Sequence, residues 1–376
     1  LVGFMYAKVP VSKYNYQRVS TPHIGKENLY LTSGHLPYYA ADMWPPMEYD
    51  GEKYYIKPMN CPHMHMIYKF RPRSYKELPI RYAEFGTVYR HEDSGTLTGM
   101  LRVRGHTTND AHIYCMEDQV IDEIIKVMQM HTYYYELFGI KDYYIELALP
   151  DFENKSDKYI NDQEDWKKSI KMLREAAIQA NIVVVEKTGG AAFYGPKFDF
   201  NIKSVTGREF GSSTNQLDFS SGKRFKLTYI DQVGKENLVP YIIHRAPLGS
   251  EERFIGFLIE HYGGAFPVWL APVQVSVLPI SEKHLDYAQK VLDSLKLVDI
   301  RCELDSRAES LGAKIRDAEM QKVPYILVMG DKEIESGSVA VRTRGKKASE
   351  TMTVEQFSNQ IKNEVVNRTN TTTTTA

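Results

Sequence analysis

The feature that most constrains this chain is a change in its strand pattern near residue 265. Before that point, between residues 191 and 244, four strand-like segments follow one another with only short polar turns between them. Tight turns cannot join parallel neighbours, so this run predicts antiparallel pairing. Beyond residue 272, strand-like and helix-like segments alternate, which predicts a compact α/β domain with a largely parallel sheet. We therefore expect an α+β chain built from two different domains.

Earlier in the chain, helices and strands mix without a fixed order. Apolar residues recur at three- and four-residue spacing over 116–139 and 162–182, so both segments are predicted as amphipathic helices. Strands are expected at 54–60, 81–91 and 100–106. Glycines and prolines mark a linker between the domains. The expected division is a larger domain over 1–267, a linker over 268–272, a smaller domain over 273–368 and a disordered threonine-rich tail over 369–376.

Composition restricts the partners and the compartment. Lys and Arg number 47 against 48 Asp and Glu, a net charge of −1, which excludes a generally basic nucleic-acid coat and leaves only a local patch for RNA. Cys61, Cys115 and Cys302 cannot build a disulfide framework and fit a reducing, cytoplasmic compartment. No apolar run reaches the roughly 18 residues that a membrane span needs. The start, LVGFMYAKVP, lacks an initiator Met and a signal-peptide pattern, so we expect a chain cut from a longer protein.

Charged and metal-capable side chains are concentrated in the stretch YRHEDSGTLTGMLRVRGHTTNDAHIYC. A polar, glycine-bearing loop separates Arg90 and Glu92 from Arg102 and Arg104, and strand alternation turns each pair toward one face. Arginines that face one cleft repel each other unless an anion lies between them, and a polyphosphate matches their guanidinium forks. The other interpretation is a surface ladder of salt bridges with Glu92.

A further arginine supports the anion hypothesis. Ser250 is a good N-cap for the segment that follows it, and Glu251 and Glu252 suit a first helical turn. Arg253 does not suit that first turn, because a cation there opposes the helix dipole. An anionic ligand at that helix end would remove the conflict, whereas an arginine turned to solvent is the simpler alternative.

Longer motifs carry a family resemblance. AEFGTVYRHEDSGTLTGMLRVRGHTTNDAHIYC resembles motif 2 of class II aminoacyl-tRNA synthetases, LGSEERFIGFLIEHYGG resembles motif 3, and YNYQRVSTPHI resembles motif 1, with Pro22 at the motif proline. IKPMNCPHMHMIY, NDAHIYC and YIIHRAPLGSEERF are similar to threonyl-tRNA synthetases rather than to the seryl or prolyl enzymes, and AAFYGPKFDF and TNQLDFS fit the same family. The resemblance covers residues 1–368 and implies an antiparallel-sheet class II catalytic domain followed by a smaller α/β anticodon-binding domain.

The resemblance implies an ATP-dependent threonine–tRNA ligase. Such an enzyme activates L-threonine to threonyl-adenylate, with Mg²⁺ bridging the phosphates of ATP, and transfers the threonyl group to the 3′ end of tRNA(Thr). The family also implies a homodimer. One alternative is a non-catalytic, synthetase-like regulator that binds RNA through the same fold, and another is a class II enzyme with a different amino-acid specificity. The intact arginines and metal-capable groups argue against the regulator, because such groups decay first when catalysis is lost.

Residue by residue, the resemblance assigns a site. Arg90 would bind the α-phosphate of ATP and the carboxylate region of the amino acid, Glu92 the adenine side, and Arg102 the γ-phosphate region. Arg253 would stack on adenine and neutralise phosphate charge. Asp110 would accept the proton of the threonine hydroxyl. The other substrate-pocket positions that match the family are Met59, Tyr194, Lys197, Thr214, Gln216 and Ser250.

The resemblance also implies one Zn²⁺ per chain, since Cys61, His112 and His244 occupy the positions of the family's zinc ligands. From the residues alone they cannot be singled out, because His63 and His65 lie closer to Cys61 and a lone cysteine is more often a buried apolar residue. Three protein ligands leave a position open for a bound molecule. In this family the amino group and side-chain hydroxyl of threonine would take it.

The chain departs from the family in three places. His106 stands where motif 2 usually carries a phenylalanine that stacks on adenine, and histidine offers less apolar area. Thr108 stands where glutamine is usual near the substrate. No segment resembles the family's N-terminal editing region. In the second domain, Glu335 and Arg344 match positions that read unpaired anticodon bases, although RTRGKK around Arg344 also reads as a solvated hairpin edge.

Overall fold

The computed structural model describes residues 14–154, 158–205, 207–235 and 238–369. The first ten residues and the tail beyond residue 369 lie outside the described residues. The chain divides into two compact units, residues 1–257 and 258–376, and each is described by itself. Over the described ranges, no helix combines the length and the apolar content that a bilayer crossing requires.

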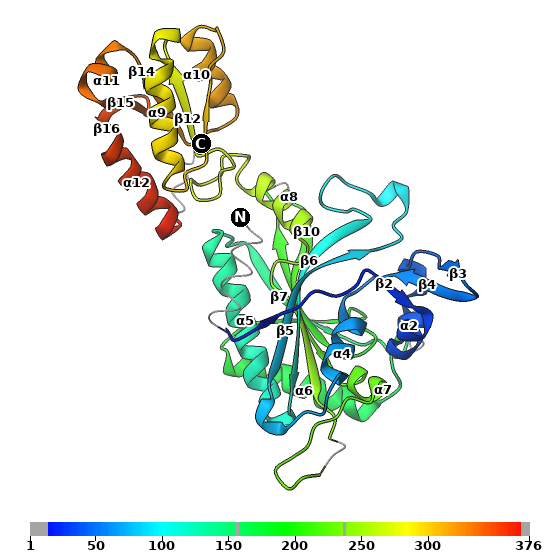
Figure 1. Ribbon diagram of the computed structural model, residues 1–376. Coiled ribbons are helices and arrows are strands. Elements are labelled where there is room, and N and C mark those ends of the chain that lie inside the picture. The colour runs from blue at the N-terminus through cyan, green and yellow to red at the C-terminus, as the bar shows by residue number, and fades with distance from the viewer. Residues whose placement is uncertain (1–13, 155–157, 206, 236–237, 370–376) are drawn as a thin grey trace. The chain divides into compact units, whose positions relative to one another are not determined.

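A mainly antiparallel sheet of eight strands organises the first unit (Figure 1). The β1/β5 and β7/β8 pairs are parallel, whereas the pairs between β5 and β7 in the sheet order are antiparallel. The consecutive strands β9, β10 and β11 are neighbours: a short turn joins β9 to β10, as predicted, whereas a longer connection that includes the helix α7 (Ser221–Phe225) joins β10 to β11. In sheet order the strands are β1 (Gln17–Arg18), β5 (Ile80–Tyr89), β6 (Gly105–Cys115), β11 (Tyr241–Ala246), β10 (Glu209–Asp218), β9 (Lys197–Lys203), β7 (Tyr143–Leu149) and β8 (Val185–Thr188).

Both long helices predicted from periodicity are present, and both are shorter than expected. They are α5 (Val120–Leu137) and α6 (Gln163–Gln179), and they pack against each other, with α5 also lying on β10 and β11. The apolar stripe predicted for α5 is buried at Val120, Ile124, Val127, Met128 and Tyr135. The amphipathic pattern therefore located the face that covers the sheet.

Shorter elements cover the opposite face of this sheet. Met64 and Tyr68 of α4 (Cys61–Lys69) share a buried apolar cluster with Tyr114 of β6 and Ile242 of β11. A three-stranded sheet lies beside them, with strand order β2-β4-β3. Its strands and the remaining helices of this unit are β2 (Ile24–Lys26), β3 (Met47–Tyr49), β4 (Glu52–Ile56), α2 (Glu27–Ser33), α3 (His35–Tyr38), α7 (Ser221–Phe225) and α8 (Glu251–His261).

Three local predictions were wrong. The strand expected at 100–106 begins only at Gly105 and runs on to Cys115, and the residues before it form a loop with one isolated bridge between Thr98 and Arg102. The third of the four strand-like segments between residues 191 and 244, at 224–231, is replaced by the end of α7 and irregular chain. The strand expected at 54–60 ends at Ile56, and helix α4 follows it at Cys61. This helix was not predicted, because its buried residues include a cysteine, a proline and two histidines, which do not form an apolar helical stripe.

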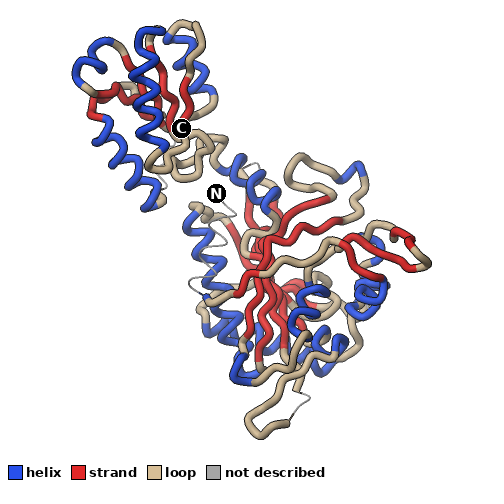
Figure 2. The backbone as a smooth tube through the Cα atoms, viewed as in Figure 1, coloured by secondary structure: helices blue, strands red, loops and turns tan. Residues whose placement is uncertain are grey.

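The second unit is an α/β sandwich around a five-stranded sheet of order β13-β12-β14-β15-β16 (Figure 2). The predicted parallel pairing holds for β12 with β13 and with β14, but β15 and β16 run antiparallel, so the sheet is mixed. Separate apolar clusters bury its two faces. Its elements are β12 (Val275–Pro279), α9 (Leu285–Lys296), β13 (Cys302–Leu304), α10 (Leu311–Met320), β14 (Tyr325–Met329), α11 (Asp331–Ser336), β15 (Ser338–Thr343), β16 (Ser349–Thr353) and α12 (Val354–Asn367).

The expected linker is packed rather than extended. Val268 and Trp269 are buried, and Val268 belongs to the core of the second unit. Arg301 donates hydrogen bonds to the carbonyl oxygens of Trp269 and Ala271 at 3.0 Å each. These contacts bind the segment to the second unit, because they satisfy backbone acceptors that a free linker would leave to water.

Candidate active site

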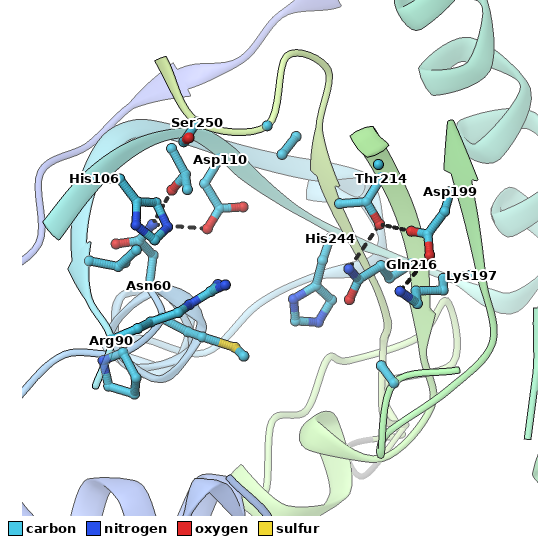
Figure 3. A pocket seen from close by; sticks show the side chains of 18 of the residues that line it. Asn60, Arg90, His106, Asp110, Lys197, Asp199, Thr214, Gln216, His244 and Ser250 are labelled. Atoms are coloured by element: carbon cyan, nitrogen blue, oxygen red, sulfur yellow. Dashed lines mark hydrogen bonds and ion pairs between the residues drawn. The ribbon is translucent and has the colours of Figure 1, made fainter. Parts of the chain in front are cut away.

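One face of the large sheet lines a cavity of about 540 Å³ (Figure 3). Strand alternation directs every second side chain of β6, including His106, Asp110 and His112, toward the same face. Antiparallel register then sets Gln216 of β10 beside His244 of β11. The residues assigned from sequence to catalysis and substrate binding all line this cavity: Met59, Arg90, Glu92, Arg102, His106, Asp110, Tyr194, Lys197, Thr214, Gln216, Ser250 and Arg253.

Arginines gather around one acidic side chain in this cavity. The Nε of Arg102 donates to a carboxylate oxygen of Glu92 at 2.8 Å. Arg253, at the start of α8, donates from Nε to the carbonyl oxygen of Leu101 at 2.9 Å. Burial, together with the charges of Arg90 and Arg102, lowers the pKa of Arg253. Three guanidinium groups balanced by a single carboxylate form a site with excess positive charge, which suits an anion.

The strand pattern predicts that Arg90 and Arg104 both face the cleft, but the two side chains lie in different surroundings. The buried Nε of Arg90 has no hydrogen-bond partner within the described part of the chain, and its guanidinium lies 6.0 Å from the ring centre of Tyr39. Arg104 instead donates to the carbonyl oxygen of Glu92 and to Ser94 Oγ, both at 3.0 Å. Arg104 therefore holds the loop together, while Arg90 keeps donor capacity for a ligand.

His106 lies half-buried between the arginines. Burial, followed by the charges of Arg90 and Arg253, lowers its pKa to about 4. The ring is therefore neutral near pH 7 and presents a flat face without adding charge. This suits stacking on a planar ligand group in the cavity.

A continuous polar chain crosses the opposite side of the cavity (Figure 3). The hydroxyl of Tyr194 donates to Gln216 Oε1, and Gln216 Nε2 donates to Thr214 Oγ1 at 2.9 Å. Thr214 Oγ1 in turn donates to Asp199 Oδ1 at 3.1 Å, and Lys197 pairs with Asp199 at 2.5 Å. Because each member is held by its neighbour, the chain presents polar groups in fixed positions.

Asp110 is oriented by a residue from another segment. Asn60 Nδ2 lies 3.0 Å from both Asp110 Oδ2 and Thr108 Oγ1, and it donates to them. Gly86 makes room for this contact, because a Cβ there would lie 2.3 Å from the Asn60 amide. Burial raises the pKa of Asp110 to about 6, against the hydrogen bond from Asn60. At pH 7 the carboxylate is mostly ionised and able to accept a proton.

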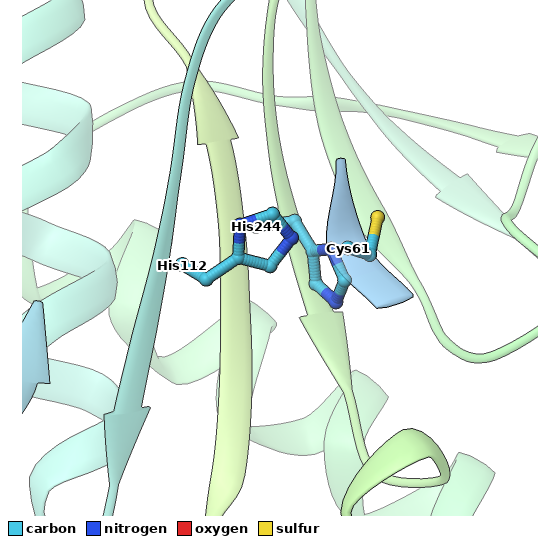
Figure 4. Close-up of side chains that lie close together, drawn as sticks. All are labelled: Cys61, His112 and His244. Carbon is cyan, nitrogen blue, oxygen red and sulfur yellow. The ribbon is translucent and has the colours of Figure 1, made fainter. Parts of the chain in front are cut away.

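Cys61, His112 and His244 come together in a buried cluster beside the cavity (Figure 4). The two histidines are direct cross-strand partners on β6 and β11, which places their rings on one face with centres 4.5 Å apart. Cys61 is the first residue of α4. One donor atom from each residue lies within 4.8 Å of the others.

The chemistry of these donors fits a thiophilic cation. Neither ring nitrogen of His112, nor Nδ1 of His244, has a hydrogen-bond partner in the part of the structure that is described. Burial lowers the pKa of His112 far below its ordinary value, which keeps the ring neutral, the form that binds metals. Burial also raises the pKa of the Cys61 thiol, and a bound cation would reverse that shift by favouring the thiolate. One sulfur and two imidazole donors with an open position suit Zn²⁺.

A second possible donor set shares one histidine with the first. His65, Asp218 and His244 also have donor atoms within 4.8 Å of each other. The Nδ1 of His65 is already 2.9 Å from the hydroxyl of Tyr114. Sequence reasoning treated His65 only as a competitor of Cys61 and did not consider Asp218.

The two residues expected to read the anticodon lie at opposite ends of β15. Glu335 is exposed near the end of α11. Arg344 is half-buried, and its guanidinium donates to the carbonyl oxygens of Lys322 at 2.6 Å, Phe266 at 2.7 Å and Ala265 at 3.2 Å. A strand between them rises about 3.3 Å per residue, so the two side chains could meet a single RNA only at separate nucleotides.

Sequence reasoning missed Asn60, Asp199 and Asp218. Asp199 and Asp218 lie on predicted strands at positions that alternate with apolar residues, and that alternation was a signal that they face a polar space. Asn60 carried no signal, because both of its hydrogen-bond partners lie on β6.

The comparisons with known families divide the chain in two. Residues 46–262 match the tRNA synthetase class II core domain of the G, H, P, S and T group. Residues 274–364 match an anticodon binding domain.

Individual relatives are similar along most of the chain. It is 49% identical over 356 residues to the threonine–tRNA ligase of Sulfurihydrogenibium sp., covering 95% of this chain and 54% of the relative. It is 49% identical over 346 residues to that of Thermus thermophilus, covering 91% and 52%. The chain thus spans about half the length of the curated relatives it matches. The crystal structure of the RNA binding domain of threonyl-tRNA synthetase from Cryptosporidium parvum matches with a TM-score of 0.90 at 32% identity, over 96% of this chain and 89% of that chain.

Proposed function

We propose, on the premise that this chain belongs to the class II tRNA synthetases and within them to the threonyl-tRNA synthetase family, that it activates L-threonine with ATP and transfers the threonyl group to the 3′ end of tRNA(Thr). The observation that carries the proposal is the content of one cavity, where an arginine cluster suited to phosphates lies with an ordered chain of polar groups. The buried set of Cys61, His112 and His244 lies next to it. Adenylation needs an anion site and an amino-acid site side by side.

In the first step, a carboxylate oxygen of threonine attacks the α-phosphorus of ATP, and the bond to diphosphate breaks. Arg90 would hold the α-phosphate and the carboxylate, and Arg102 would bind the γ-phosphate region after exchanging its ion pair with Glu92 for the ligand. Glu92 would then hold the adenine side. Arg253 would cover adenine and neutralise charge. These groups act by positioning and by electrostatic stabilisation rather than by covalent chemistry.

In the second step, a terminal ribose hydroxyl of tRNA attacks the carbonyl carbon of the adenylate, and AMP leaves. Mg²⁺ would accompany ATP and offset part of the negative charge of its phosphates.

Threonine recognition rests on its hydroxyl and amino group. A Zn²⁺ held by Cys61, His112 and His244 would supply a Lewis-acid anchor for these two groups. Asp110, oriented by Asn60, would accept the hydroxyl proton. Tyr194, Gln216 and the neighbouring polar residues would hold the rest of the amino acid.

Zinc content and ATP–pyrophosphate exchange test the proposal. We expect one zinc per chain and exchange that depends on threonine. Cys61→Ser should lose both, since the donor set loses its sulfur. Cys115→Ser is the matched control, because Cys115 is also a buried cysteine, on β6, and its thiol lies 3.9 Å from the carbonyl oxygen of Tyr241, away from the donor set. Metal-free protein that activates threonine at the wild-type rate would remove the zinc assignment.

The same exchange assay separates the enzyme from its main alternative. A non-catalytic regulator would bind tRNA yet show no threonine-dependent exchange in the wild-type chain. The regulator is not favoured, because the arginine cluster and the donor set would have no function in it. If the wild-type protein binds tRNA(Thr) and fails to exchange, the catalytic proposal is wrong.

The second unit is proposed to bind the anticodon, with the catalytic domain over 1–267 joined through 268–272 to an anticodon-binding domain over 273–368. Support comes from the anticodon-domain match over residues 274–364. Glu335→Gln should weaken tRNA(Thr) binding without lowering stability, because the side chain is exposed. Arg344→Ala should weaken both, because its guanidinium also holds three carbonyl oxygens. Unchanged tRNA affinity in both variants would reject these contacts.

A homodimer and a cytoplasmic location complete the proposal. Support comes from β1, which lies within the motif 1 segment and is an end strand of the sheet among the residues that the structure describes. All three cysteines are free thiols, as a reducing compartment allows. Light scattering after size exclusion should give twice the chain mass, and a monomer at micromolar concentration would contradict the dimer.

A further inference from the structure

A buried carboxylate lies behind one of the proposed metal ligands. Oδ2 of Asp218 is 2.9 Å from Nε2 of His244, and Asp218 has no solvent exposure. Its other oxygen, Oδ1, accepts the backbone N–H groups of Ser220 and Ser221, both at 2.8 Å. Both oxygens are therefore occupied, and the carboxylate has a fixed orientation.

This arrangement determines which nitrogen of His244 carries the proton. A carboxylate can only accept, so the hydrogen bond requires a proton on Nε2. Neutral imidazole then has its lone pair on Nδ1, the nitrogen that has no hydrogen-bond partner in the described structure. The ring is further restrained by Tyr194, which stacks on it with centres 4.8 Å apart and planes 18° apart.

We infer that Asp218 is a positioning residue of the metal site: it holds His244 as the Nε2-protonated tautomer, so that Nδ1 is ready to bind the cation shared with Cys61 and His112. The inference rests on the zinc site put forward under the proposed function. Carboxylate–histidine–metal arrangements of this kind orient the ligand and raise its basicity, and losing the outer partner typically lowers metal affinity 10–100-fold.

The alternative is that Asp218 itself binds the cation, together with His65 and His244. That would require Oδ2 to leave Nε2 of His244, and Oδ1 already accepts two N–H groups. It would also exclude the sulfur of Cys61, and thiolate is a softer donor that favours Zn²⁺ more than a carboxylate does. The positioning role keeps every observed hydrogen bond, whereas the ligand role breaks one.

Asp218→Asn is the sharpest test. The amide oxygen can still accept the N–H groups of Ser220 and Ser221, but an NH₂ group now faces His244. An NH₂ group donates, so it favours a proton on Nδ1 and thereby blocks the nitrogen that should bind the cation. We expect zinc affinity, measured by competition with a chromophoric chelator, to fall about 10–100-fold. His65→Gln, the matched control at a neighbouring buried histidine, should retain wild-type affinity.

Three outcomes are distinct. If the wild-type chain binds no zinc, the zinc proposal and this inference both fall. If the wild type binds zinc and Asp218→Asn binds it equally well, only the positioning role is overturned. If His65→Gln loses affinity as strongly as Asp218→Asn, the ion lies in the alternative set, which also overturns it.

A measurement on the unmutated chain covers the case in which Asp218→Asn does not fold. In zinc-depleted wild-type protein with ¹⁵N-labelled histidine, two-bond correlation spectra distinguish the two imidazole tautomers. We expect His244, assigned by comparison with His244→Gln, to be protonated on Nε2. A proton on Nδ1 would contradict the inference directly.

Discussion

Replacing Lys57 by Met should lower the free energy of unfolding of the first unit by about 3 kcal/mol, the lower end of the cost of breaking a buried ion pair. The ammonium of Lys57 donates to Thr21 Oγ1 at 2.7 Å and lies 4.0 Å from Glu84 Oε2. The two charged side chains are only 1% and 2% exposed. Glu84 in turn accepts the N–H of Thr21 at 3.0 Å and its hydroxyl at 2.9 Å.

The magnitude follows from what Met leaves behind. A Met side chain fills a similar volume, so the cavity cost is small, but the carboxylate of Glu84 stays buried without a counter-charge. Removing one partner of such a pair typically costs about 3–5 kcal/mol. Here the two donors of Thr21 remain, so the lower end applies. A loss of about 3 kcal/mol is a large share of the 5–15 kcal/mol that stabilises an ordinary domain.

Urea unfolding at pH 7.5 measures the effect, followed by tryptophan fluorescence in a Trp269→Phe background, so that the signal comes from the first unit, where Trp166 is buried. Lys57→Met with Glu84→Gln should recover most of the loss, because the unpaired charge is gone while an oxygen remains for Thr21. Arg174→Met is the control: it breaks an exposed pair with Glu186 and should cost at most about 1 kcal/mol. A Lys57→Met loss as small as the control, or a double variant no better than the single one, would refute the reasoning.

Three further predictions concern the ligand pocket and the core. His106→Phe should lower the KM for ATP by the equivalent of about 0.5–1.5 kcal/mol, the size of an aromatic contact, and leave the KM for threonine unchanged. Steady-state kinetics measure both constants, and a higher KM for ATP would argue against stacking. His131 is fully buried against Phe200, and burial lowers its pKa to about 3 from an ordinary 6.5. The unfolded chain therefore binds a proton that the folded one does not, so stability is full above pH 6.5 and declines as the pH falls. By pH 4.5, protonation of His131 in the unfolded chain lowers the free energy of unfolding by about 2–3 kcal/mol. In urea unfolding at pH 7 and pH 4.5, His131→Leu should therefore lose correspondingly less stability on acidification than the wild type. An equal loss in the two proteins would contradict the prediction. Finally, a pocket that binds a hydroxyl should reject valine by about 10⁴–10⁵-fold but serine, which lacks one methyl, by only about 10–200-fold. Because weak rejection lets serine be activated, this chain tested by itself should accumulate Ser-tRNA(Thr), and cleavage of that ester faster than its spontaneous rate would contradict the prediction.

Local patterns in the sequence determined the secondary structure wherever one period dominates. The three- and four-residue spacing located α5 and α6, since an amphipathic stripe must face a core whatever that core is. The short turn between β9 and β10 required antiparallel neighbours. The change of pattern beyond residue 265 correctly indicated two units with different sheets. Long motifs, read as a family resemblance, identified the residues that line the cavity.

The sequence pattern failed where polar loops and short helices carry no period. The loop before Gly105 was read as a strand because Leu101 and Val103 alternate with arginines, yet Arg104 bonds to the loop itself. Helix α4 was missed although it contributes Cys61. In both cases the conformation depends on contacts between residues that are not sequence neighbours, and hydrophobic periodicity does not report such contacts.

The tertiary structure alone decided how the site is assembled. Strand register sets His112 opposite His244, and α4 brings Cys61 to them, although the three residues are far apart in the chain. Asp218 and Asn60 gain their partners in the same way, across strands. The physical reason is that periodicity reports only which side of an element is buried. Which buried side chains then touch depends on register and packing between elements, and only the folded chain determines those.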